Sequence, residues 1–223
     1  MEAVRYKDFN SRKIEESEVI TRILKGEKEL YELLVRRNNQ KLYRVIRSYL
    51  KEEDDIEDSM QNTYLKAFTK LHQFKLESSF STWLIRIGIN EALARIKKKG
   101  KLFALPSVSN DPDDAKLIQI PDTKQLNPQD QMIRNEIRQL LEDAIDTLDT
   151  KYKTVYIMKE VEGMSLKEIS IALELTLSNV KIRLYRSKEM LKDKLYEVSN
   201  HKNIFEFGFN KCDRLTENVM RLI

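Results

Sequence analysis

The apolar residues of this chain recur at steps of three and four over most of its length, which is the spacing of an amphipathic helix. In the first half, this spacing predicts helices at about 17–26, 30–49, 54–71 and 81–101. In the second half, it predicts a helix from 133 to 148 and further helices between 150 and 198. With only 5 Gly and 4 Pro in 223 residues, few positions interrupt these helices. The pattern therefore predicts an all-α fold.

The helical periodicity is lost between residues 102 and 130. This stretch contains all four prolines, and its five acids against two bases give it a net charge of −3. Loops of this length without secondary structure are uncommon inside a compact domain. We therefore expect a flexible acidic linker at 102–130 that joins two helical domains, at 1–101 and 131–198.

Residues 165–198 have the pattern of a helix-turn-helix. Ser165 and Glu168 can form a capping box, and the small Ala172 allows two helices to cross closely. A short turn at 174–176 then leads into a longer basic helix. The inward side of that helix is expected to hold Leu177, Val180, Leu184 and Leu191. An ordinary helical hairpin with solvated cations is the alternative, and the short turn favours the helix-turn-helix.

Charge is segregated along the chain, although the net charge is only +4. Residues 52–58 carry six acids and no base, and residues 95–101 carry five bases and no acid. Favourable placement at helix ends explains one or two residues of each run, but not a whole run. The separation indicates one surface for a polyanion and another for a protein partner.

The residues that most enzymes and metal sites need are scarce. A single cysteine, Cys212, and two separated histidines allow no internal disulfide and no metal-ligand cluster. The chain has no P-loop, GxGxxG or GxSxG motif, and His72 is more typical of a surface histidine than of a base. We therefore expect no enzyme activity, no catalytic residue, no metal and no cofactor. The polar N-terminus and the lack of a long apolar run predict no membrane insertion and a cytoplasmic location.

The segment 74–101 combines aromatic and basic side chains. It contains the only tryptophan, Trp83, preceded by Phe74 and Phe80, and it ends in the basic run. Aromatic rings beside phosphate-binding cations are typical of proteins that hold single-stranded nucleic acid. The alternative is a core helix with a solvated end. Trp83 is expected in the core, whereas Asn90 is unfavourable inside a helix and indicates a functional role.

The segment 199–223 differs from both halves. Phe205, Phe207 and Phe209 alternate in it, and an amphipathic pattern follows them. Such an apolar segment is unfavourable in solvent. We expect this C-terminal extension, whose role is unknown, to dock on the second domain or on a partner.

Three motifs, in their order along the chain, resemble the sigma-70 family of bacterial RNA polymerase sigma factors, and within it the extracytoplasmic-function (ECF) group. They are DDIEDSMQNTYLKAFTKL, then FSTWLIRIGIN with the basic run, then LKEISIALELTLSNVKIRLYRSKEML. The resemblance covers about residues 15–198. It implies a region 2-like domain that binds core polymerase and the −10 element, and a region 4-like domain that binds the −35 element.

The resemblance also implies roles for individual residues. The single-stranded −10 element would be contacted by Phe74, Phe80, Arg86, Ile87, Asn90, Lys97 and Lys98. The −35 element would be contacted by Ser178, Lys181, Arg183, Tyr185 and Arg186. Core polymerase would be contacted by Asp55, Ile56, Asp58, Met60 and Gln61. The chain departs from the family pattern at Ile182, where a small polar residue is common, and at Ser178-Asn179, so its −35 sequence does not follow from the family.

The function that the resemblance implies is that of a sigma factor. It would bind core polymerase at the β′ clamp helices and the β flap, recognise promoter DNA and promote melting. An anti-sigma factor is implied by family analogy. A stand-alone helix-turn-helix regulator is the alternative from a different class, and it would bind duplex DNA by itself, usually as a dimer. The segment 74–101 favours the sigma factor, since a sensor domain has no need of it, and the helix-turn-helix disfavours an RNA-binding adaptor.

Overall fold

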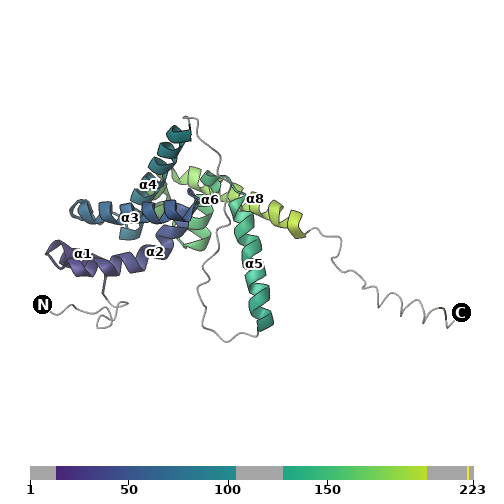
Figure 1. The fold of residues 1–223 in the computed structure, drawn as a ribbon, viewed down its shortest axis with the longest axis horizontal. Helices are drawn as coiled ribbons and strands as arrows, with labels where there is room; N and C mark the ends of the chain where they lie inside the picture. The colour runs from purple at the N-terminus through teal and green to yellow at the C-terminus, as the bar shows by residue number, and fades with distance from the viewer. Residues whose placement is uncertain (1–13, 104–127, 200–219, 221–223) are drawn as a thin grey trace.

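The computed structural model describes residues 14–103, 128–199 and 220. Where the apolar spacing predicts helices within these ranges, the structure has helices joined by short turns and loops. The first helical region contains α1 (Glu16–Leu24), η2 (Lys28–Leu30), α2 (Tyr31–Arg47), α3 (Glu53–Thr69), η3 (Leu71–Gln73) and α4 (Phe80–Phe103). The second contains α5 (Pro128–Asp146), α6 (Thr150–Tyr156), η4 (Ile157–Val161), α7 (Leu166–Leu173) and α8 (Leu177–Ser199) (Figure 1). No strand occurs within these ranges. The predicted all-α fold with two helical regions is confirmed.

The predicted linker and C-terminal extension lie largely outside the described residues. The helices that flank the linker reach further into it than the periodicity predicts, since α4 continues to Phe103 and α5 begins at Pro128. Proline is favourable in the first turn of a helix, because the amide it lacks has no helical partner there. The structure therefore begins the second helical region before the predicted boundary at 131.

The first helical region packs α1 to α4 around one apolar core. Leu34, Leu42, Ile46 and Leu84 are among its fully buried residues. Helices α2 and α4 cross closely at Gly88, where an added Cβ would lie 2.7 Å from Leu42 Cδ1 and 3.4 Å from Ile46 Cδ1. The crossing therefore depends on the absence of a side chain at position 88.

Replacing Gly88 by alanine should destabilise the protein. Overpacking costs about 1–3 kcal/mol, and the gain of about 0.5–1 kcal/mol in helix propensity offsets only part of it. We expect Gly88→Ala to lower the free energy of unfolding by about 1 kcal/mol. Gly100→Ala is the matched control on the same helix, because no atom lies within 4 Å of its added Cβ. This control should leave stability unchanged or raise it in urea unfolding; equal effects of the two variants would contradict the crossing geometry.

The second helical region contains the predicted helix-turn-helix. Ser165 caps α7, and both hydrogen bonds of the capping box with Glu168 are present. The chain then turns at Glu174, which has a left-handed backbone (φ 54°, ψ 41°), and α8 follows. Val180 and Leu191 are buried, as predicted, but the prediction for Leu177 is wrong: it is 49% exposed. Leu177 is the first residue of α8 and lies at the turn, before the helix reaches its packing partners.

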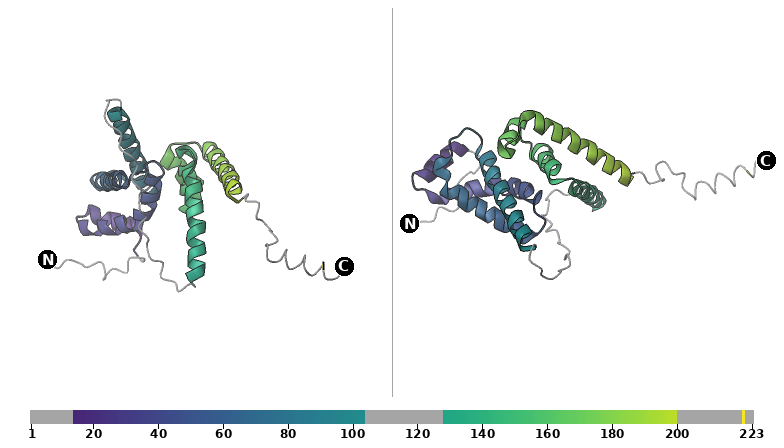
Figure 2. Two further views of the ribbon diagram at one scale, coloured as in Figure 1. Left: turned by 45° about the vertical axis from the view of Figure 1, so that its right-hand side comes forward. Right: turned by 90° about the horizontal axis from the view of Figure 1, so that it is seen from above.

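The two helical regions pack directly against each other (Figure 2). Helix α7 lies on α4, and η4 lies on α2. A single set of buried residues, named here the interdomain cluster, joins them: Val45, Ile85 and Ile89 from the first region, and Val155, Met158, Met164, Ile169, Ala172 and Val180 from the second. The contact thus has a buried apolar core of its own, with ion pairs around it.

Candidate nucleic-acid interface

The aromatic residues of the segment 74–101 form one cluster before and within the first turn of α4. The Phe74 ring centroid lies 5.9 Å from that of Phe80 and 5.3 Å from that of Trp83. Phe80 is 1% exposed, whereas Phe74 and Trp83 are half-buried. The prediction that Phe80 offers its ring to a base is therefore not met, because the core of the first region covers it. Of the two phenylalanines, Phe74 alone keeps exposed surface, and Phe80 supports it from below.

The loop before α4 is held by local polar contacts. Ser79 Oγ accepts a hydrogen bond from Thr82 N at 3.3 Å, so Ser79 caps a helix that begins at Phe80. Within the same loop, Leu76 has a positive φ of 59° and is exposed. A leucine in the left-handed region is unusual. The cap and this backbone conformation fix the position of Phe74 relative to α4.

Beyond its first turn, α4 presents polar side chains on one surface. Arg86, Asn90, Lys97 and Lys98 are exposed, in agreement with a role in binding, and Ile87 is half-buried against the core of the first region. Two other cations of the basic run, Arg95 and Lys99, form ion pairs within the protein. Arg95 binds Asp55 and Asp58 of α3 at 2.7 and 2.8 Å, and Lys99 binds Asp55.

The acidic helix α3 is less available to a partner than its sequence indicates. Asp55 is only 6% exposed and Ile56 is fully buried, because α3 turns these two residues toward α4. Their predicted contact with polymerase is therefore not supported. Asp58 and Gln61 are exposed and Met60 is half-buried. The two charge runs of the sequence thus neutralise each other in part, and Asp58, Met60 and Gln61 remain at the surface.

The Asp55 contacts make the stability of the first region depend on pH. Burial alone would raise the pKa of Asp55, but hydrogen bonds from Lys99 and Arg95 outweigh it and hold the pKa below its ordinary value. The folded pKa is thus lower than the unfolded one, so the stabilisation is present above about pH 4 and is lost as pH falls through the folded pKa.

Replacing Asp55 by asparagine should therefore destabilise the protein at neutral pH. We expect Asp55→Asn to lower the free energy of unfolding by about 2 kcal/mol at pH 7, because it leaves Arg95 and Lys99 without their buried partner. The difference from wild type should shrink as the pH approaches 3. Asp54→Asn, at the exposed neighbouring position, is the control and should cost less than about 1 kcal/mol. Urea unfolding at both pH values checks this; a pH-independent difference would contradict the assignment.

Helix α8 carries the residues predicted to contact the −35 element. Ser178, Lys181, Tyr185 and Arg186 are exposed near its start, and Arg186 Nη1 donates to the Tyr152 hydroxyl at 3.4 Å. Arg183 is half-buried. Exposed cations and hydrogen-bonding groups on the second helix of a helix-turn-helix are what major-groove binding requires.

The contact between the two regions was not predicted, and it lies beside the residues of α4 and α8 that were predicted to contact DNA. Ile85 and Ile89, on either side of Arg86 along α4, are buried with Val180 of α8 in the interdomain cluster. Arg86 itself forms an ion pair with Glu174 in the turn of the helix-turn-helix. In the part of the chain that the structure describes, one face of α4 is therefore covered by the second region.

The ion pairs around the interdomain cluster all have the same polarity. The bases come from the first region and the acids from the second: Arg44 binds Glu162 at 2.7 Å, Arg47 binds Asp146 at 2.9 Å, and Arg86 binds Glu174. Each of these three arginines is thus paired with a carboxylate of the second region.

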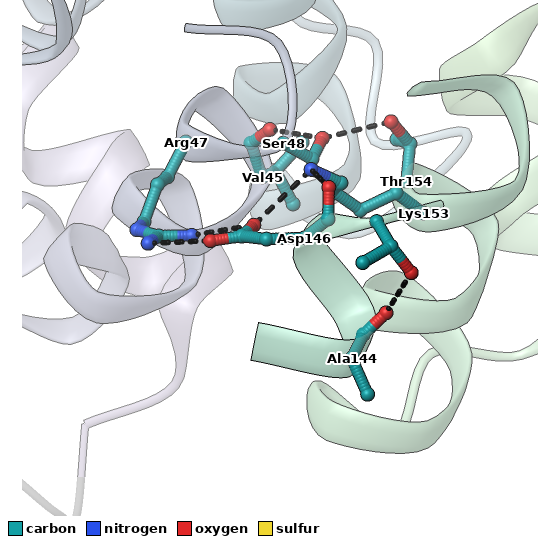
Figure 3. A network of polar contacts seen from close by, with 8 residues as sticks. Val45, Arg47, Ser48, Ala144, Asp146, Lys153 and Thr154 are labelled. Atoms are coloured by element: carbon teal, nitrogen blue, oxygen red, sulfur yellow. Dashed lines mark hydrogen bonds and ion pairs between the residues drawn. The ribbon is translucent and has the colours of Figure 1, made fainter. Parts of the chain in front are cut away.

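Figure 3 shows the part of this contact between α2, α5 and α6. Asp146 accepts two hydrogen bonds from Arg47, at 3.0 and 2.9 Å, and one from Lys153 at 3.1 Å. Burial alone would raise the pKa of Asp146, but Arg47 and Lys153 hold the pKa below its ordinary value. Beside it, the buried Ser48 hydroxyl donates to the Val45 carbonyl and lies 2.7 Å from Thr154 Oγ1. The contact therefore combines apolar packing with directional hydrogen bonds, which fix how the two regions are aligned.

Glu168 joins the two regions at the other end of the contact. Its carboxylate closes the capping box of α7 and also accepts hydrogen bonds from Ser79 Oγ at 3.2 Å and Thr82 Oγ1 at 3.4 Å. Hydrogen bonds from the Ser165 backbone first, and then from these hydroxyls, lower its pKa despite partial burial. One residue thus starts a helix of the helix-turn-helix and holds the first turn of α4.

Two other kinds of feature, metal clusters and membrane spans, are absent from the described ranges. They hold no group of three or more His, Cys, Asp or Glu side chains arranged to bind a metal ion. None of the described helices is long and apolar enough to cross a membrane.

Comparison with known proteins agrees with these two regions. Residues 34–102 match the family described as Sigma-70 region 2, and residues 138–191 match Sigma-70, region 4. The chain is 28% identical over 181 residues to an ECF RNA polymerase sigma-E factor of Haemophilus influenzae, covering 79% of this chain and 93% of that protein. It is 27% identical over 187 residues to the protein of the same name from Escherichia coli K12, covering 83% and 96%.

Two solved structures share the fold. The structure of CnrH in complex with the cytosolic domain of CnrY matches with a TM-score of 0.54 at 22% identity, over 79% of this chain and 94% of that chain. The sigma factor RpoE from Bartonella quintana, in complex with the anti-sigma factor NepR, matches with a TM-score of 0.57 at 20% identity, over 74% and 96%. With region 2 and region 4 matched in order on the two helical regions described above, the chain belongs to the sigma-70 family of RNA polymerase sigma factors, in its ECF group.

Proposed function

We propose that this sigma factor reads the −10 element as single-stranded DNA with α4 and the loop before it, and the −35 element as duplex DNA with α8. The observation that supports this most is the coexistence, in one chain, of an exposed asparagine and lysines on α4 with an exposed basic helix-turn-helix. The chain supplies no covalent chemistry. Binding energy from captured bases offsets the few kcal/mol that unstacking costs at each step.

On α4, each exposed residue has a distinct task. Asn90 reads the hydrogen-bonding edge of a base that has left the stack, since an amide both donates and accepts. Phe74 supplies the apolar wall of the base site, and Lys97 and Lys98 hold backbone phosphates. Arg86 can bind backbone phosphate only after its ion pair with Glu174 is broken. The buried Phe80 and the half-buried Trp83 pack against Phe74 and act as its scaffold.

On α8, Lys181, Tyr185 and Arg186 contact the −35 element, with Ser178 at the first turn. Arg183 is half-buried, so only part of its side chain is available to contact DNA. Ile182 is 52% exposed among these polar residues. An apolar side chain there favours contact with a thymine methyl group over a hydrogen bond to a base.

Core RNA polymerase is held by the exposed end of the acidic helix, through Asp58, Met60 and Gln61. The protein then acts where polymerase is, in the cytoplasm. One structural neighbour is a sigma factor in complex with an anti-sigma factor. By analogy, we propose that this chain also binds an anti-sigma factor. The stand-alone regulator is not favoured, since both family regions of a sigma factor are present.

We further propose that the free chain is closed and binds promoters weakly. Closure keeps Arg86 on Glu174 and buries Val180 against Ile85 and Ile89. If only a small fraction of the free chain is open, the apparent affinity for DNA equals the affinity of the open form multiplied by that fraction. Polymerase would restore affinity by binding the open form better than the closed one.

Run-off transcription with core polymerase on a promoter library tests the function and reads the promoter sequence together. We expect specific start sites only when the chain is added. The selected promoters should share two sequence elements at a fixed spacing, one for each reading helix. Start-site selection by core polymerase alone would contradict the proposal. A stable homodimer that binds duplex DNA with full specificity and without polymerase would support the regulator instead.

A further inference from the structure

We propose that the C-terminal segment Phe205–Phe209 of this chain docks into an apolar groove between α5 and α8. The groove is a cavity of about 660 Å³ on the second helical region. Its apolar lining comes from three elements: Leu140 of α5, Tyr156 at the end of α6, and Leu191, Leu195 and Tyr196 of α8. It lies outside the residues assigned above to the −10 and −35 elements, so the inference does not depend on promoter recognition.

The apolar surface extends from the groove along α5. Ile137, Leu140 and Leu141 are 60%, 46% and 36% exposed, at helical spacing with the buried Ala144. Single exposed apolar residues are ordinary on a protein surface, but a continuous stripe beside a groove is typical of a docking site. Within the described residues, Ala144 and Ile145 near the end of α5 are buried with Leu191 of α8, whereas Ile137, Leu140 and Leu141 keep exposed surface.

The segment that follows α8 has the matching chemistry. Phe205, Phe207 and Phe209 alternate with Glu206 and Gly208. In an extended chain, alternate side chains point to the same side, so the three rings form one apolar face. Burying three phenylalanines in an apolar groove is favourable, at about 1.5–3 kcal/mol for each ring that is fully buried.

The tether has the right length for this return. Phe205 is six residues beyond Ser199, the last residue of α8, and six extended residues span about 20 Å. Leu191 is eight residues before Ser199, which is about 12 Å of helix. The segment can therefore reach back to the groove at Leu191 and Leu195. A short tether also gives an effective concentration of about 1 mM or more, which favours this occupant over a free one.

The rim of the groove is charged. Glu160 and Lys188 form an ion pair at 2.8 Å across it, and Lys192 lies on the same side of α8, 5.8 Å from the centroid of the Tyr196 ring. In the proposed docked arrangement, with the phenylalanines inward, Glu206 would lie on the outer side of the segment, next to Lys192. An acidic residue between two anchors is thus matched to a basic rim.

Disulfide trapping in the full-length chain tests the docking. In a Cys212→Ser background, the pair Lys192→Cys and Glu206→Cys should oxidise to an intramolecular disulfide. The control pair is Met190→Cys with Glu206→Cys, because position 190 is exposed at the same height of α8 but on its opposite face. We expect the first pair to react at least about tenfold faster than the control. Equal rates, or a disulfide between two chains, would overturn the proposal, the latter in favour of a second copy as the occupant.

Hydrogen exchange of the full-length protein gives an independent readout. The variant Phe205→Ser, Phe207→Ser, Phe209→Ser should accelerate exchange in residues 137–145 by about tenfold, because the groove loses its cover. The control variant His201→Ser, Lys202→Ser, Asn203→Ser changes three polar residues of the same tether and should have no effect. Unchanged exchange in the phenylalanine variant, or protection of wild-type α5 only after polymerase is added, would overturn the proposal. The second result would identify polymerase as the occupant and leave the proposed function intact.

Discussion

Opening the contact between the two helical regions should let the free chain bind promoter DNA. We expect the double variant Asp146→Arg, Glu162→Arg to bind a single-stranded −10 oligonucleotide roughly 30-fold more tightly than wild type does, without polymerase. Each substitution removes an ion pair of the contact and places a cation opposite Arg47 or Arg44. The Arg47 and Asp146 side chains are about 40% exposed, so solvent screening limits the loss to about 1 kcal/mol or less for that pair. Repulsion between the new like charges brings the total to about 2 kcal/mol.

A charge-matched control separates opening from simple electrostatic attraction. Added positive charge alone strengthens binding to nucleic acid. The variant Glu136→Arg, Asp143→Arg changes two exposed acids of α5 by the same amount, and neither acid takes part in the three ion pairs between the regions. Fluorescence anisotropy with both variants should show a large gain only for the pair at the contact. Equal gains would mean that closure does not limit DNA binding.

Replacing Asn90 by alanine should have the second large effect, on promoter choice. We expect Asn90→Ala to reduce run-off transcription from promoters with the preferred −10 sequence by about tenfold or more, since reading one base edge contributes about 1–3 kcal/mol. Discrimination among −10 variants at one position should fall at the same time. Stability should not fall, because Asn90 is exposed and alanine is the better helix former.

Two controls make the assignment of Asn90 specific. Asn39→Ala makes the same chemical change at an exposed position of α2 and should leave transcription unchanged. Gln61→Lys, on the exposed face of α3, should weaken binding to core polymerase and spare −10 preference among the transcripts that remain. If Asn90→Ala and Gln61→Lys gave the same defect, the separate roles of α4 and α3 would be wrong.

Local signals in the sequence were sufficient for the helices and the helix-turn-helix. The capping box of Ser165 and Glu168 and the turn at 174–176 depend on residues a few positions apart, so spacing alone predicts them. The exposure of Asn90, Lys97 and Lys98 also follows from local features. Trp83, which was expected in the core, is half-buried and packs against Phe74 and Phe80, so that prediction is met only in part.

Contacts between segments far apart in the sequence could not be predicted from these local signals. Asp55 and Ile56 look like an exposed acidic helix start in the sequence, and only the packing of α3 on α4 turns Asp55 toward Arg95, 40 residues away. Arg47 and Asp146 are separated by 99 residues, with the linker between them. No periodicity links such positions, so the closed arrangement of the two regions could be read only from the structure. Phe80 was misassigned for the same reason, since its ring is covered by residues from other helices.

The distance between the two helical regions, measured in the free chain and on polymerase, tests the central claim most directly. The claim is that α4 and the helix-turn-helix face each other in the free sigma factor and separate on core polymerase. Spin labels at Gln40→Cys on α2 and Glu189→Cys on α8, in a Cys212→Ser background, occupy exposed positions without an assigned role. Electron–electron double resonance should give one short distance distribution for the free chain and a longer, non-overlapping one after core polymerase is added. A broad distribution in the free chain, or the same short distance in both states, would contradict the account.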